Sequence, residues 1–201
     1  MQINALVALV TFEEAREFLD LKNSDRDNVV RRLVNAVSSD CARYCGRELV
    51  YKESVIEYHD GDGKDAIIVR RPPIVKVTEL IPDVNGSALT EGADDDFVIW
   101  NAKAGIIKLV NGSIFPIARH GVKITYDGGY SVAVDPDASL VPEDLKQSIL
   151  EGIAFRYLEQ EHKRFGVTSQ SIGRQITSSY GTEEYGPHVL KVWDSYFLAT
   201  F

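Results

Sequence analysis

The stretch VPEDLKQSILEGIAFRYLEQEHKR, from Val141 to Arg164, decides the fold of this chain. Its apolar residues recur every four positions, at Leu145, Ile149, Ile153 and Tyr157, and are widened into a stripe by Leu150, Ala154 and Leu158. One face of a helix can bury such a stripe. Pro142 suits a first helical position, because it lacks only an N–H group that would be unpaired there, and Gly166 favours a helix end. We therefore expect one long amphipathic helix, which needs a surface to pack against.

Two helices near the N-terminus offer that surface. Thr11 and Glu14 have the spacing of a capping box, which predicts a short helix to about Leu21. A second helix is expected between Ser24 and Gly46, because its apolar residues keep the helical period: Val30, Leu33, Val34, Val37, Cys41 and Tyr44. Together with the long helix, these two predict a helical core.

The middle of the chain changes from a helical to an extended pattern at Leu49. Short apolar runs separated by turn residues predict strands at 55–58, 66–69, 74–81, 97–100, 106–110 and 122–126. The turn-rich stretch His59–Asp65 predicts a hairpin between the first two. No helical pattern lies between these runs, so we expect an inserted antiparallel sheet or small sandwich and an α+β fold.

The C-terminal part differs again in composition. Residues 167–185 are rich in Ser, Thr, Gly and Gln, which indicates an extended arm, and 187–201 can form one last short helix with many aromatic side chains. That aromatic surface needs burial by its own domain or by a neighbouring subunit. The expected organisation is N-terminal helices at 1–48, an inserted β region at 49–130, a loop and the long helix at 131–166, and a C-terminal arm at 167–201.

Charge and composition narrow the functional classes. The 201 residues are 44% hydrophobic, enough for a packed core, and carry a formal net charge of −8. This acidity disfavours nonspecific binding to nucleic acid or anionic lipid, although an acidic surface can line a DNA passage. No run is long enough to span a bilayer, and the N-terminal run has no basic lead-in, so neither a membrane partner nor a signal peptide is expected.

Motifs for chemistry are incomplete. Asp60–Asp65 begins like a calcium loop, but Lys64, Asp65 and Arg71 stand where an oxygen ligand, a glycine and a glutamate are needed. Cys41, Cys45 and His59 make only a partial zinc set. A nucleophile elbow and a phosphate loop are both missing from the sequence. We therefore expect no catalytic residue, no metal and no cofactor, and keep a metal-dependent hydrolase built around His59 and the Asp60–Asp65 loop as the less favoured alternative.

The order of these pieces resembles the head–tail connector (adaptor) proteins of tailed bacteriophages and prophages, often labelled DNA-packaging proteins. The resemblance rests on several stretches: Thr11–Leu19, Asp25–Leu49, Val69–Val77, Ile124–Tyr130, Val141–Lys146 with the long helix after it, and Val167–Gly173. Each motif alone is weak, and their order along nearly the whole chain is the specific signal.

The resemblance implies a structural protein and not an enzyme. Such connectors form a ring of identical subunits, commonly twelve, which docks beneath the portal protein, extends the DNA channel and offers a platform for the stopper or tail. DNA would pass through without sequence-specific binding. The expected location is the head–tail interface of the virion, with host cytoplasm during assembly. The alternative within this class is another virion assembly protein, such as a stopper or tail-completion factor.

A ring subunit needs contact surfaces, and charged or aromatic residues outside the expected core are the candidates. The candidate assembly contacts are Arg70, Arg71, Glu151, Arg156, Glu159, Lys163, Ile172, Ile176, Tyr180, Trp193, Tyr196 and Phe197.

Overall fold

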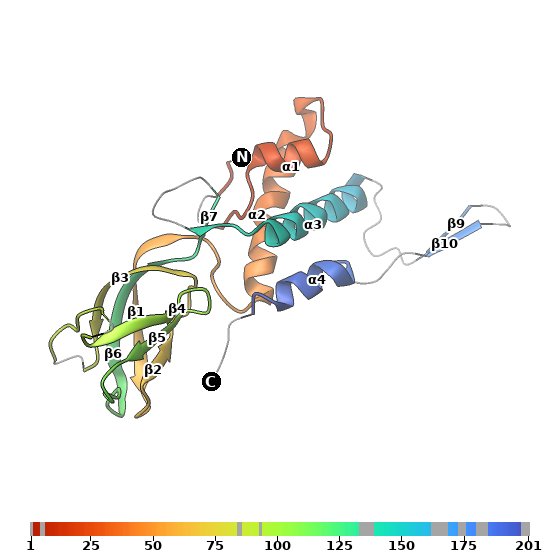
Figure 1. Cartoon of the computed structure of the whole chain (residues 1–201). Coiled ribbons are helices and arrows are strands. Elements are labelled where there is room, and N and C mark those ends of the chain that lie inside the picture. The colour runs from red at the N-terminus through yellow and green to blue at the C-terminus, as the bar shows by residue number, and fades with distance from the viewer. Residues whose placement is uncertain are drawn as a thin grey trace. The chain divides into compact units, whose positions relative to one another are not determined.

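The computed structural model describes residues 2–4, 7–83, 86–92, 94–132, 139–161, 169–172, 176–179 and 185–197. Two compact units make up the chain (Figure 1). The helical unit joins Met1–Cys41 to Pro142–Tyr196, and the β unit joins Ala42–Val141 to Phe197–Phe201. Helices together with antiparallel sheets confirm the α+β class. The expected four-part organisation of the chain stays a prediction.

The helical unit is built on α1 (Phe12–Phe18), η1 (Ser24–Arg26), α2 (Asp27–Tyr44), α3 (Glu143–Glu161) and α4 (Pro187–Asp194). α3 is the long helix expected from the apolar period. The capping box of α1 is also confirmed, because Thr11 Oγ1 accepts a hydrogen bond from the Glu14 N–H and Glu14 Oε2 accepts one from the Thr11 N–H. Within the described ranges, no helix combines the length and apolar character needed to cross a membrane.

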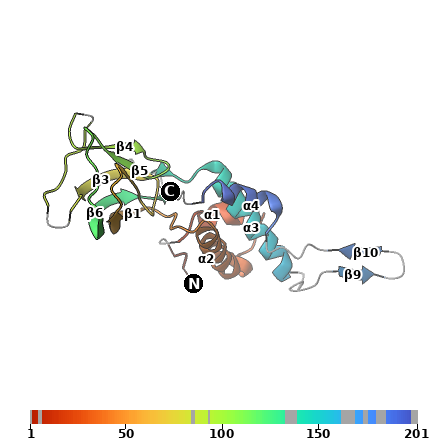
Figure 2. The ribbon, with the colours of Figure 1, turned by 90° about the horizontal axis from the view of Figure 1, so that it is seen from below.

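The core of the helical unit follows the predicted stripe. Leu145, Ile149, Ile153 and Tyr157 are all buried on α3, whereas Leu158 at the margin of the stripe is exposed. α3 packs against both α1 and α4 (Figure 2). Gly152 marks a close approach between α3 and α2, since a Cβ atom there would lie only 3.0 Å from Val37 Cγ1. The absence of a side chain at this position lets the two helices meet.

An ion pair fixes α1 to α3. Lys146 Nζ on α3 lies 3.0 Å from Glu14 Oε1, so the carboxylate that caps α1 also faces a cation. Burial opposes ionisation of Glu14, but hydrogen bonds from Thr11 and Lys146 outweigh it and hold its pKa below the ordinary 4.5. The hydrogen bond to Glu14 raises the pKa of Lys146. The pair is therefore charged on both sides across the neutral range.

Glu14→Gln should flatten the acid side of the stability profile. Because the folded pKa of Glu14 is depressed, its stabilisation is present above the unfolded pKa and is lost as pH falls through the folded pKa. The expected loss is under about 1 kcal/mol, since the pair is partly exposed. Urea unfolding from neutral pH to below pH 4.5 measures it. Glu143→Gln, which removes the exposed second carboxylate near Lys146, is the control and should leave the profile unchanged.

Two three-stranded antiparallel sheets form the β unit. The first has the order β1-β6-β3, from Lys52–Gly61, Ala118–Gly128 and Ile74–Ile81, and the second has the order β2-β5-β4, from Ala66–Ile68, Ile106–Leu109 and Phe97–Asn101. Side chains of both sheets enter a single apolar cluster, with Tyr126, Ile124 and Ile107 fully buried. The small sandwich is thus the form that the inserted region takes. β7 (Tyr130–Ser131) and β8 (Ser139–Leu140) add one short parallel pair.

The prediction of a hairpin around His59–Asp65 is wrong. β1 pairs with β6, and β2 pairs with β5, so the turn carries the chain from one sheet to the other. The backbone of the turn bonds instead to a later loop: Gly63 N–H donates to Phe115 O, and Phe115 N–H donates to Lys64 O. Burial of Phe115 in the shared core favours this arrangement over a local hairpin.

A buried carboxylate lies within the β unit. Glu57 on β1 is 8% exposed and accepts hydrogen bonds from the Tyr126 hydroxyl and the Arg70 N–H, and its Oε2 lies 2.8 Å from His59 Nε2. Burial alone would favour its neutral form, but these hydrogen bonds hold its pKa below the ordinary value. Burial and the neighbouring Glu57 raise the pKa of Tyr126. The network joins β1, β6 and the segment before β3.

β9 (Ser169–Ile172) and β10 (Ile176–Ser179) pair antiparallel with each other, with Ile176 opposite Ile172. Among the described residues they form a two-stranded sheet of their own. The serine- and threonine-rich part of the expected arm therefore contains a short β-hairpin.

Candidate assembly surfaces

Arg156 lies in a cluster that joins three parts of the helical unit. Its Nη2 is 2.8 Å from Asp40 Oδ2 on α2, and its guanidinium lies 5.0 Å from the centre of the Tyr185 ring. The Tyr185 hydroxyl donates to the same Asp40 oxygen at 2.7 Å. Arg156 therefore links α3 to α2 and to the segment just before α4. Its contacts are made inside its own subunit.

Trp193 is a core residue of the helical unit. Its side chain is 1% exposed, and its indole Nε1 donates to Ser148 Oγ on α3 at 3.0 Å. The Tyr185 ring lies against it, with centroids 4.7 Å apart. Of the two ways to bury this aromatic surface that the sequence left open, the chain uses its own domain for Trp193.

Two further candidates also hold α4 and its end to α3. Glu151 Oε1 accepts a hydrogen bond from Gln147 Nε2, and its Oε2 is hydrogen-bonded to His188 Nε2 of α4. The Tyr196 hydroxyl donates to Asp144 Oδ1 at 2.7 Å. These side chains therefore have partners in their own subunit, and both remain partly exposed.

The side chains of the basic pair Arg70-Arg71 have different surroundings in the β unit. Arg71 Nη1 donates to Val50 O at 2.7 Å, and its Nη2 lies 3.7 Å from Glu48 Oε2. Arg70 is exposed, while its backbone N–H donates to the buried Glu57. Arg71 thus stabilises the β unit from within, and Arg70 presents its cation to solvent.

The remaining candidates have less defined surroundings. Phe197 is 59% exposed, and Glu159 is half-buried on α3. Ile172 and Ile176 are paired positions in the β9–β10 register. Lys163 and Tyr180 lie outside the described residues. All twelve candidates stay predictions as assembly contacts.

Sequence reasoning missed an apolar outer face on the β2-β5-β4 sheet. Trp100 on β4 is 66% exposed, with Lys108 Nζ 4.9 Å from its ring centre, and Ile68, Val98 and Ile106 are partly exposed on the same sheet. The signal was present in Ile106-Ile107, because consecutive apolar residues on a strand place one on each face. Exposed apolar surface of this kind is typical of protein contact sites, which makes this face a candidate.

A second exposed apolar site lies on the loop between β5 and β6. Ile117 is 84% exposed and Ile114 is 57% exposed, although Phe115 between them is fully buried. Burial of Phe115 anchors the loop, so its two isoleucines are held outward in a fixed place. Together with Trp100, they are the strongest candidates on the β unit for contact with another protein.

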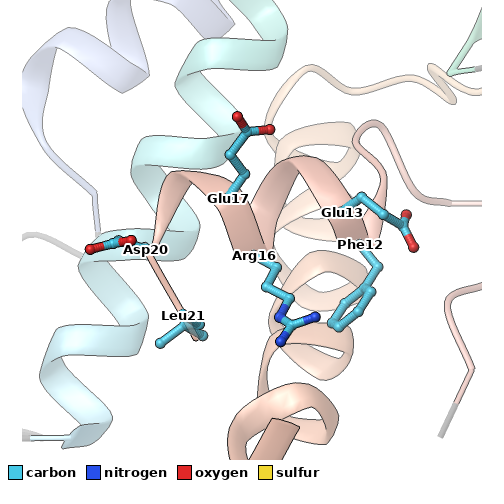
Figure 3. Close-up of a pocket in the computed structure, with 6 residues that line it drawn as sticks. All are labelled: Phe12, Glu13, Arg16, Glu17, Asp20 and Leu21. Atoms are coloured by element: carbon cyan, nitrogen blue, oxygen red, sulfur yellow. The ribbon is translucent and has the colours of Figure 1, made fainter. Parts of the chain in front are cut away.

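A groove lies along α1, lined by Phe12, Glu13, Arg16, Glu17, Asp20 and Leu21 (Figure 3). We call it the α1 groove. Its volume is about 370 Å³, and it is open to solvent. Arg16 Nη2 donates to Lys22 O at 3.4 Å, and its Nε lies 3.8 Å from Asp27 Oδ1. The groove thus combines an apolar base with exposed carboxylates.

The acidic turn that resembled a calcium loop has its carboxylates directed to separate partners. Asp62 pairs with Lys64, Asp65 pairs with Lys108, and Asp60 accepts from the His120 N–H. His59 is hydrogen-bonded to Glu57. Within the part of the chain that the structure describes, no three His, Cys, Asp or Glu side chains gather in a way that can hold a metal ion. The geometry gives the hydrolase alternative no support.

Comparison with known proteins identifies a family. The sequence model described as head completion protein (HCP) matches residues 8–197, nearly the whole chain. No curated protein matches the sequence at a significant level.

Three solved structures share the fold. A chain of the neck of an empty gene transfer agent (GTA) particle, computed with C6 symmetry, matches with a TM-score of 0.56 and 17% identity, over 100% of this chain and 97% of that chain. A chain from the virion of the native GTA particle matches with a TM-score of 0.58 and 14% identity, over 100% and 94%. A native neck computed with C12 symmetry gives 0.51 and 17%, over 100% and 97%. At such low identities the likeness establishes a common fold.

Proposed function

This chain belongs to the head completion protein family, and we propose that identical copies of it form a ring, twelve in number when docked, at the head–tail junction of a tailed phage or a related particle. Membership of the family confirms the resemblance seen in the sequence, and the chain is a structural head–tail connector. The single observation that carries the proposal is the family match over residues 8–197.

The structural relatives support a ring. Their chains come from necks computed with C6 or C12 symmetry, and this chain matches their fold over its full length. Closed rings of one protein use repeated identical contacts, so each subunit must bury surface on two sides. The exposed Trp100, Ile114 and Ile117 offer apolar surface that a neighbour or another neck protein can cover.

The charge of the chain suits a DNA passage. With a net charge of −8, copies arranged around a channel would repel the phosphates of passing DNA more than they would hold them. DNA would therefore move through the ring without sequence-specific binding. The ring would then not only separate two protein layers but also continue the DNA channel.

The proposed partners lie on the two sides of the ring. The portal protein would bind on the head side, and the stopper or tail-completion protein on the tail side. The β9–β10 hairpin is the segment proposed to reach a partner, because an isolated two-stranded sheet is marginally stable in water and gains from pairing with another protein. The finished ring belongs to the virion, and assembly takes place in the host cytoplasm.

Purified protein mixed with the portal protein of the same genome tests the proposal. Native mass spectrometry and negative-stain images should show rings, alone or on the portal. A protein that stays monomeric and never binds portal would overturn it. Pulldown with tail-side proteins in place of portal separates the connector from the alternative, a stopper or tail-completion factor, which would bind the tail side and not the portal.

Deletion of Ser169–Ser179 should abolish attachment to the portal without unfolding the chain. The two deleted strands, β9 and β10, pair with each other, whereas Tyr185 and α4 remain to complete the helical core. A short Gly/Ser linker keeps the ends connected. Cosedimentation with portal measures attachment, and far-UV circular dichroism measures folding. Normal attachment by the folded deletion variant would exclude the hairpin as the portal contact.

A further inference from the structure

A ring of identical subunits needs two different surfaces on each copy that fit one another. This follows because a head-to-tail contact joins one patch of a subunit to another patch of the next subunit, and closes when the rotation permits. The chain should therefore carry both halves of such a contact. The inference below rests on the proposed ring.

The α1 groove has the character of one half. Phe12 and Leu21 contribute apolar surface, and in Figure 3 the side chains of Phe12 and Arg16 extend toward the same side of α1. The volume of about 370 Å³ is near the lower end of binding pockets, which is enough for one or two large side chains. An aromatic or long aliphatic side chain of a partner is the natural occupant of its base.

The charge around this groove is negative. Its lining contains three carboxylates, Glu13, Glu17 and Asp20, all exposed, against the single guanidinium of Arg16. Charged groups of both signs border the lining: Asp27, which faces Arg16, Arg31, whose guanidinium lies 3.9 Å from the centre of the Phe12 ring, and Lys22, whose backbone oxygen accepts from Arg16. The lining residues themselves keep an excess of two negative charges, so a cationic occupant fits best.

The sequence contains a segment of matching composition directly after α3. His162-Lys163-Arg164-Phe165 offers two permanent cations and an aromatic ring in consecutive residues. We propose that the α1 groove of one subunit receives Lys163, Arg164 and Phe165 of the next subunit in the ring. Phe165 would fill the apolar base, and the two cations would face Glu13, Glu17 and Asp20.

Charge complementarity is the reason to choose a second copy as the occupant. An excess of two negative charges in the groove meets two positive charges in the segment, and both belong to the same chain, as a head-to-tail ring contact requires. The pairing also accounts for Lys163, which sequence reasoning placed among the assembly contacts and for which the described residues provide no account.

Charge reversal on each side tests the contact. Glu13→Lys with Glu17→Lys makes the groove positive, and Lys163→Glu with Arg164→Glu makes the segment negative. Each double variant alone should lose ring formation by about tenfold or more in affinity, because like charges then meet. An equal mixture of the two should form rings again, since the unchanged segment of one fits the unchanged groove of the other, and the two reversed halves also attract. Native mass spectrometry, with portal present where wild-type rings need it, identifies the mixed rings by mass.

The controls separate this contact from the ring itself. Glu53→Lys with Glu91→Lys makes the same change in net charge as the groove variant, at exposed positions of the β unit, and should leave rings intact. Intact rings from either groove or segment variant would overturn the inference and leave the proposed function standing. Failure of the mixture, with recovery in one chain that carries all four changes, would also overturn it, because the segment would then occupy the groove of its own chain. Absence of wild-type rings with and without portal would overturn the proposed function itself.

Discussion

Trp193→Ala should lower the free energy of unfolding of the helical unit by about 3–5 kcal/mol, the usual cost of removing a large aromatic side chain from a packed core. The side chain is 1% exposed, so truncation leaves a cavity between α3 and α4. It also removes the indole donor from Ser148 Oγ, which is itself buried, and the ring that lies against Tyr185. The cavity and the lost hydrogen bond act in the same direction.

The chain carries its own control, because it has only one other tryptophan. Trp100 is 66% exposed on β4, so Trp100→Ala should cost under about 1 kcal/mol by the usual size of surface substitutions. Urea titrations followed by far-UV circular dichroism report the helical unit. In each variant, tryptophan fluorescence comes from the single remaining indole. Its emission should be blue-shifted where the buried Trp193 remains and red-shifted where the exposed Trp100 remains. Equal destabilisation by the two variants would contradict the assigned burial of Trp193.

The contrast between these tryptophans shows how far sequence reasoning reaches. Periodicity predicts which face of a helix is apolar, and the buried residues of α3 agree with it from Leu145 to Tyr157. It gives no information about the partner of that face. The Trp193–Ser148 contact joins positions 45 residues apart, and Ser148 reads in the sequence as a polar interruption. Burial of Trp193 by its own subunit therefore had to come from the structure.

The same limit explains the candidate contacts. Arg156 and Glu151 lie among polar residues of α3, and each pairs with a group far along the chain, Asp40 and His188 respectively, which the sequence does not predict. Their role as assembly contacts stays a prediction. A charged side chain looks the same in a sequence whether it faces water or a distant counter-ion. The prediction of a hairpin at His59–Asp65 is wrong because it used local information alone. Turn residues predict that the chain bends, but burial of the distant Phe115 determines which strand pairs next.

The second large effect is expected at Glu57, where a carboxylate is enclosed in the β unit. Glu57 accepts hydrogen bonds from the Tyr126 hydroxyl and the Arg70 N–H and lies beside His59. Its ionised carboxylate therefore provides hydrogen-bond partners for polar groups from three segments. Removing one member of a buried charged network leaves the others without partners, which costs more than the network contributes when intact. Sequence alone gave no sign of this, because Glu57 sits in an ordinary alternating strand.

Glu57→Ala should therefore destabilise the β unit by about 3–5 kcal/mol, and Glu57→Gln by about 1–3 kcal/mol, because the amide keeps one acceptor oxygen. Tyr126→Phe removes only the hydroxyl, and combining it with Glu57→Gln in a double-mutant cycle gives the coupling between the two side chains. Glu53→Ala, at an exposed position of the same strand, is the matched control and should cost little. Hydrogen exchange of β1 and β6 amides locates the loss in the first sheet. A Glu57→Ala variant as stable as Glu53→Ala would mean that water already satisfies these groups in solution, and the network would then contribute no net stability.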